Sequence, residues 1–165
     1  MPILNPNALD FISRSPEQSR RMGMRLGTML KRGDILCLQG DLGAGKTTFV
    51  QGLAQGWGSL DPVSSPTFII VNLYRRVDEN QLFHLDTYRL ESASEAEMLD
   101  LDEMLTTGSL VIEWAERIES ILPKERLWLK LEYIDEEYRR LKFTAEGEYY
   151  QNMIDQLRKS AFGVA

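Results

Sequence analysis

The stretch "GDLGAGKTTF", residues 40–49, decides the fold of this 165-residue chain. Its first eight residues satisfy the pattern G-x-x-x-x-G-K-[ST], in which glycines let several backbone N–H groups point at one anion. The apolar run Ile35–Leu38 lies just before it and predicts a buried strand. An apolar helical face follows the loop, made of Phe49, Val50, Leu53, Ala54 and Trp57. The order strand, glycine loop, helix predicts a phosphate-binding loop, because the helix N-terminus adds its positive dipole end to the amides.

The second half of the loop carries the predicted contacts to a nucleotide and a metal ion. Lys46 supplies a positive charge for the β- and γ-phosphates, and the Thr47 hydroxyl is the expected magnesium ligand. A simple glycine turn would not require this Lys-Thr pair, so we favour a phosphate site. The residues predicted to bind the nucleotide are Gly43, Ala44, Gly45, Lys46, Thr47 and Thr48.

Glu113 is the predicted acidic partner of the loop. Such loops need a carboxylate for the metal, usually at the end of a nearby strand, and Glu113 directly follows the apolar run Leu110–Ile112. A carboxylate at the mouth of a buried strand is costly unless it meets a cation. We therefore predict that Glu113 and Thr47 bind magnesium, directly or through water. The alternative is a salt-bridged glutamate at a strand end.

The stretch "HLDTYR", residues 84–89, is the second source of polar side chains. Strand alternation would place His84, Asp86 and Tyr88 on one face. Asp86 is predicted to orient the attacking water or hold a metal-bound water, and its alternative role is to pair with Arg89. His84, the only histidine, is interpreted as a polar strand residue satisfied by a neighbour rather than as a catalytic base. The predicted catalytic residues are Lys46, Asp86 and Glu113.

The connector "SSPTF", residues 64–68, leaves two interpretations open. Thr67 can sense a γ-phosphate, as threonines of ordered switch segments do. Equally, the segment can be an ordinary Ser-Pro turn that enters a strand.

The remaining pattern predicts one α/β domain over residues 1–165, with a P-loop NTPase-like three-layer fold. Its mixed β-sheet is expected to include an antiparallel hairpin around the polar turn 77–80. Strands are expected at 10–13 (on an edge), 35–38, 67–76, 81–90, 109–114, 126–134 and 139–144. Helices are expected at 15–33, at 46–58, at 94–105 and from 147 onward.

Composition limits the classes of partner and compartment. A formal net charge of −6 makes the chain a poor independent binder of nucleic-acid backbones. Cys37 is the only cysteine, so we expect it to be buried in a strand and the protein to be cytoplasmic. We expect neither a signal peptide nor a membrane segment, because no long apolar run is present. Three arginine pairs are interpreted mainly as solvated surface: Arg20–Arg21, Arg75–Arg76 and Arg139–Arg140.

Four motifs in this order and at compact spacing, "GDLGAGKTTF", "SSPTF", "FHLDTYRL" and "VIEWAER", closely resemble the bacterial TsaE (YjeE) family. The resemblance covers about residues 15–133. It implies a small cytosolic ATPase needed to make threonylcarbamoyladenosine beside the anticodon of transfer RNA, without itself transferring the group. The implied partner is the TsaD–TsaB heterodimer, with transfer RNA reached only indirectly or through that complex.

The same resemblance assigns roles to residues. It implies that Lys46 and the loop amides hold ATP, that Thr47 and Glu113 hold Mg²⁺, and that Asp86 serves hydrolysis. It places residues 15–18 near the nucleotide base, with the hairpin after Tyr133 as a neighbour of the base. Two residues depart from the family pattern, Phe68 in place of a tyrosine and Asp100 in place of a glycine. The chain after Arg139 matches nothing in the family pattern.

Two alternative functions stay open at this stage. A small-molecule or nucleotide kinase is compatible with the length, although the hairpin after the loop's helix and the lack of an arginine-rich lid disfavour it. A nucleotide-gated docking module, in which hydrolysis is incidental, is the other. A guanine-reading N-K-x-D is absent from the sequence, which disfavours a GTPase. No arginine finger is obvious, and Arg89 is a candidate in cis.

Overall fold

The computed structural model describes residues 7–41, 43–63 and 71–163. Seven strands in these ranges form one sheet, in the order β1-β7-β6-β2-β5-β4-β3. The strands are β1 (Ala8–Ser13), β2 (Ile35–Gln39), β3 (Val71–Arg75), β4 (Gln81–Asp86), β5 (Gly108–Glu113), β6 (Arg126–Tyr133) and β7 (Arg139–Glu146). The helices are α1 (Pro16–Gly27), α2 (Lys46–Trp57), α3 (Ala93–Glu97), α4 (Leu101–Thr107) and α5 (Glu148–Phe162), with a 3-10 segment η1 (Ala115–Ile121).

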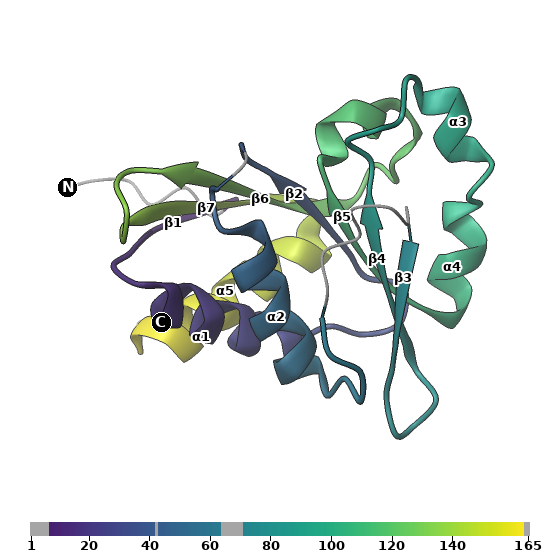
Figure 1. Cartoon of the computed structure of the whole chain (residues 1–165). Helices are drawn as coiled ribbons and strands as arrows, with labels where there is room; N and C mark the ends of the chain where they lie inside the picture. The colour runs from purple at the N-terminus through teal and green to yellow at the C-terminus, as the bar shows by residue number, and fades with distance from the viewer. Residues whose placement is uncertain (1–6, 42, 64–70, 164–165) are drawn as a thin grey trace.

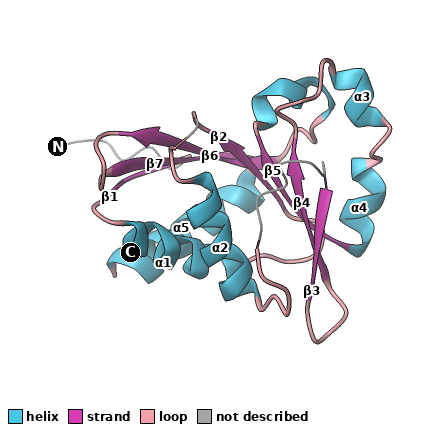
Figure 2. Cartoon of the chain, viewed as in Figure 1, coloured by secondary structure: helices cyan, strands magenta, loops and turns pink. Residues whose placement is uncertain are grey.

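The predicted mixed sheet is confirmed. Strands β6, β2, β5 and β4 run parallel, while β1, β7 and β6 pair antiparallel at one end and β3 pairs antiparallel with β4 at the other (Figure 2). Helices α1, α2 and α5 lie together under one side of the sheet, and α3 and α4 lie beside the β3–β5 end (Figure 1). All six residues of β5 are buried, because this central strand is covered on both faces. The result is the predicted three-layer α/β fold.

Helices α1 and α2 cross at backbone contact distance, a feature that the sequence pattern did not predict. Gly23 and Gly27 on α1 face Gly52 and Gly56 on α2. A Cβ atom added to Gly52 would lie 2.0 Å from the carbonyl oxygen of Arg20, well inside van der Waals contact. The four glycines therefore allow the helix that follows the loop to pack directly against α1.

We expect Gly52→Ala to destabilise the protein by about 3 kcal/mol or more, because the added methyl group forces two backbones apart. Urea unfolding followed by circular dichroism measures the effect. Gln55→Ala, at an exposed position of the same helix, is the control and should stay within about 0.5 kcal/mol of the unmodified protein. Equal unfolding midpoints for the two variants would contradict the close crossing.

Two predicted elements extend well beyond the observed ones. The first helix ends at Gly27 rather than Gly33, because Met29 and Leu30 donate to carbonyls only three residues back and the chain tightens into a turn. Strand β4 ends at Asp86 rather than Leu90.

The helix predicted over 94–105 is in fact two, α3 and α4, separated at Asp100. Asp100 has φ 53°, in the left-handed region, and caps α4 by accepting from the amide of Glu103 at 3.3 Å. Aspartate tolerates this region better than most residues. The departure from glycine at this position therefore still permits a left-handed turn.

The C-terminal segment supports the strand that leads into the loop. Helix α5 is confirmed, with Tyr150, Met153, Ile154 and Leu157 buried. The Tyr150 hydroxyl accepts a hydrogen bond from the backbone N–H of Ile35, the first residue of β2, at 3.0 Å. The chain after Arg139, which matches nothing in the family pattern, thus contributes β7, an inner strand between β1 and β6, and a helix whose Tyr150 supports the start of β2.

Candidate functional site

The predicted site residues meet at the carboxyl ends of the central parallel strands. Strand β2 runs directly into the glycine loop at Gly40. Leu38 of β2 pairs in register with Glu113, and Glu113 pairs with Asp86 of β4. Both predicted carboxylates therefore lie side by side next to the loop, at the edge where open α/β sheets bind their ligands.

The loop turns into α2 through two glycines with positive φ, Gly43 at 81° and Gly45 at 97°. The first helical hydrogen bond runs from the amide of Phe49 to the carbonyl of Gly45, at 3.0 Å. The three amides before Phe49, those of residues 46–48, belong to the first turn, where a helix offers its N–H groups outward. The Ala44 amide instead donates to the Asp41 carbonyl at 3.0 Å, within the loop.

Lys46 extends its side chain back across the loop. Its Nζ donates to the carbonyl of Gly40 and to that of Asp41, the latter at 3.1 Å, and lies 4.2 Å above the ring of Trp114. Burial lowers the pKa of the Lys46 ammonium, and Glu113 is the strongest of the nearby carboxylates that oppose this shift. A partly buried ammonium at the mouth of the loop is placed to meet an anion.

Glu113 is buried and held by His84. Its Oε2 accepts a hydrogen bond from His84 Nε2 at 2.6 Å, and His84 Nδ1 lies 2.8 Å from the Tyr74 hydroxyl. An ionised carboxylate can only accept, so Nε2 carries the proton of this bond, and in the neutral imidazole Nδ1 accepts from the Tyr74 hydroxyl. The interpretation of His84 as a polar strand residue satisfied by neighbours is confirmed, and the imidazole fixes one oxygen of Glu113.

Asp86 occupies the neighbouring strand end. Burial raises the pKa of its carboxyl group, while the hydrogen bond from the Tyr88 amide to its Oδ1, at 2.8 Å, opposes that rise. This bond turns the chain out of β4, so Tyr88 does not share a strand face with His84 and Asp86, and that prediction is wrong. Arg89 follows in the same turn with an exposed side chain.

Aromatic residues around Lys46 were not predicted as part of the site. Trp114 has φ 60°, a strained left-handed conformation, and its carbonyl accepts from the Thr87 hydroxyl at 2.6 Å. The Tyr88 ring packs on Trp114 at 4.9 Å between centroids, and Arg117 lies 4.9 Å from the Tyr88 ring. The positive φ of Trp114 depends on tertiary contacts, so no sequence signal could have revealed it.

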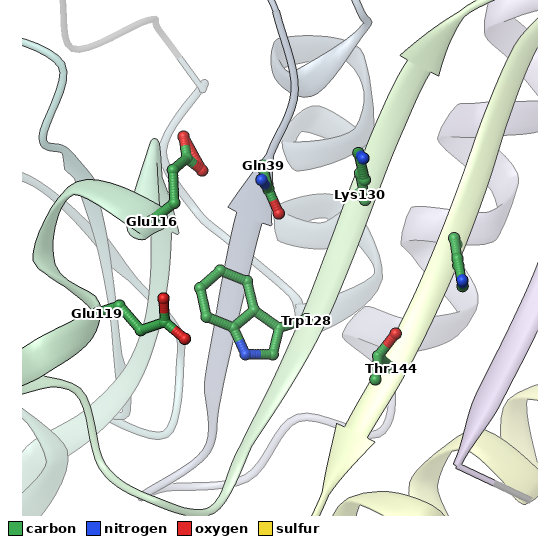
Figure 3. A pocket seen from close by; sticks show the side chains of 7 residues that line it. Gln39, Glu116, Glu119, Trp128, Lys130 and Thr144 are labelled. Carbon is green, nitrogen blue, oxygen red and sulfur yellow. The ribbon is translucent and has the colours of Figure 1, made fainter.

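A hollow of about 290 Å³ lies beside the loop on the sheet face away from α2. Figure 3 shows Glu116 and Glu119 on one side of it, Lys130 and Thr144 on the strands opposite, and Trp128 between them. Burial raises the pKa of the Glu116 carboxyl group. The predicted nucleotide-binding residues do not line this hollow, so it is separate from the phosphate loop.

The donor set fits a magnesium ion shared with a phosphate ligand. In the part of the chain that the structure describes, no three His, Cys, Asp or Glu side chains are arranged to hold a metal by themselves. Magnesium does not need such a cage, because it keeps several waters and uses one or two protein ligands plus phosphate oxygens. A hydroxyl from Thr47 and a carboxylate from Glu113 match that chemistry. Thr67 and Phe68 lie outside the described residues.

Comparisons with known proteins decide the family. Residues 13–141 match the family model described as "Threonylcarbamoyl adenosine biosynthesis protein TsaE". The chain belongs to the TsaE family. The tRNA threonylcarbamoyladenosine biosynthesis protein TsaE of Bacillus subtilis (strain 168) is 40% identical over 146 residues, covering 88% of this chain and 90% of that protein. The TsaE protein of Streptomyces coelicolor is 39% identical over 135 residues, with 78% and 91% covered.

A solved TsaE-type structure supports the same fold. The crystal structure of Bacillus subtilis YdiB superposes with a TM-score of 0.77 at 34% identity, covering 93% of this chain and 95% of that one. The role of the TsaE family lies in biosynthesis of tRNA threonylcarbamoyladenosine, and its P-loop NTPase-like fold is that of nucleotide-binding proteins. Among the described helices of this TsaE chain, none is long and apolar enough to cross a membrane.

Proposed function

We propose that this protein is a Mg²⁺-dependent ATPase of the cytoplasm, required to form the threonylcarbamoyl modification of the transfer RNA adenosine next to the anticodon. It acts with the TsaD–TsaB heterodimer and does not transfer the group itself; transfer RNA is met only through that complex. The observation that carries the proposal is the convergence of Lys46, Glu113 and Asp86 at one end of the parallel strands.

The proposed chemistry is in-line attack of water on the γ-phosphate. The first-turn amides of α2 and the Lys46 ammonium bind the phosphates and stabilise the negative charge that builds up in the transition state. Asp86, with its raised pKa, orients the attacking water. Thr47 and Glu113 would hold Mg²⁺, which when bound neutralises phosphate charge. His84 keeps Glu113 facing the loop through the 2.6 Å hydrogen bond.

Phosphate release from ATP, measured with and without purified TsaD–TsaB, tests the proposal. We expect slow hydrolysis by the chain alone and stimulation by about tenfold or more with the pair, since a partner that completes such a site can supply up to 10³–10⁵ in rate. Phosphate transferred to an added metabolite would instead support a kinase. Tight nucleotide-dependent docking to the pair with no need for turnover would support a docking module.

A further inference from the structure

Arg139 brings a second cation to the glycine loop from the far end of the chain. Its Nε donates to the carbonyl of Gly43 at 3.2 Å, across 96 positions of sequence. The side chain also passes within 3.9 Å of the place where a Cβ of Gly45 would be. Strand β7 thus positions a guanidinium directly against two glycines of the predicted phosphate loop.

The guanidinium is held by backbone carbonyls rather than by acids. Arg139 Nη1 donates to the carbonyls of Asp135 and Tyr138, the latter at 3.0 Å, and the group stacks 4.6 Å from the Tyr133 ring. Within the described residues, Arg139 forms no ion pair with a carboxylate. Its positive charge is therefore fixed in place by the β6–β7 turn without being neutralised there.

The next residue shows that this arrangement is specific to Arg139. Arg140 pairs with Asp10, with 2.9 Å from Nε to Oδ1, and lies 3.7 Å from Glu132 through Nη1. Alternation along β7 sends the two side chains to opposite faces of the strand. One member of the arginine pair is thus a neutralised surface residue, whereas the other faces the loop with two N–H groups on Nη2 that donate to no described residue.

We propose that Arg139 binds a phosphate oxygen of the nucleotide, as a second cation beside Lys46. The proposal rests on the proposed function, because it requires a phosphate chain in the loop. Arginine forms charge-assisted, often bidentate hydrogen bonds with phosphate, and its fork is already oriented here by Gly43, Asp135 and Tyr138. The ligand class is a nucleoside di- or triphosphate, and adenosine without phosphates gains nothing from this contact.

Calorimetric titration tests the assignment by measuring affinity for MgADP and for adenosine. The variants compared with the unmodified protein are Arg139→Ala, Arg139→Gln, Arg139→Lys and Arg140→Ala. We expect Arg139→Ala and Arg139→Gln to bind MgADP about 10- to 100-fold more weakly, since hydrogen bonds to charged groups are the stronger class. Arg139→Lys should recover part of the loss, and Arg140→Ala should bind normally. Adenosine binding should be the same in all four, and thermal unfolding confirms that each variant is folded.

Three results would overturn the assignment. If Arg139→Ala bound MgADP as tightly as Arg140→Ala does, Arg139 would make no contact with the phosphates. Normal affinity in Arg139→Gln alone would mean that the side chain only supports the Gly43 carbonyl, and a loss confined to the partner-stimulated rate would mean that it binds the partner. If the unmodified protein bound no MgADP, or Lys46→Ala bound it equally well, the proposed function itself would fail together with this inference.

Discussion

Lys46→Ala is expected to reduce kcat/KM for ATP hydrolysis by about 10³-fold or more while leaving the fold intact, because removing preorganised positive charge from a transition state carries the largest single effect. The side chain contacts loop carbonyls and the Trp114 ring but fills no part of the apolar core. Burial lowers the pKa of its ammonium, so the folded state gains little from the charge. The thermal midpoint should therefore move only by a few degrees.

The measurement pairs steady-state phosphate release with nucleotide titration and circular dichroism. Lys124→Ala, at an exposed position before β6, is the matched control and should hydrolyse ATP normally. Unfolding of Lys46→Ala would show that the residue is structural. Full activity in a folded Lys46→Ala protein would remove the phosphate loop from the mechanism.

Glu113→Gln is expected to lower hydrolysis by about 100-fold or more and to weaken its dependence on Mg²⁺, because a neutral amide replaces the proposed metal-binding carboxylate. Its stability should stay close to that of the unmodified protein. The amide oxygen still accepts the hydrogen bond from His84, which is 2.6 Å long in the native pair.

Glu113→Ala separates the two roles of this residue. It leaves the buried N–H of His84 without its acceptor, and we expect a loss of about 1–3 kcal/mol in unfolding free energy in addition to the lost activity. Magnesium titrations of phosphate release and urea unfolding report the two effects independently. Normal activity of Glu113→Gln at low Mg²⁺ would refute the metal assignment and leave Glu113 as a structural partner of His84.

The sequence by itself determined the phosphate loop and its immediate surroundings. Strand β2, the loop and α2 are contiguous, and the residues 35–57 contain the apolar strand, the glycines and the helical face that specify them. Both hairpins also followed from alternation around polar turns. These features are local, so propensity and periodicity are sufficient to reveal them.

Only the tertiary structure decided which side chains surround the loop. Periodicity shows which face a residue occupies, but it does not show which strand lies beside it. The bond from His84 to Glu113 joins positions 29 apart, and that from Arg139 to Gly43 joins positions 96 apart. Both depend on the strand order, which places β4 beside β5 and carries the β6–β7 turn to the loop. The position of Glu113 beside the loop was predictable, because a carboxylate directly follows an apolar strand. The position of Arg139 was not predictable, because only its neighbours in space bring it to Gly43.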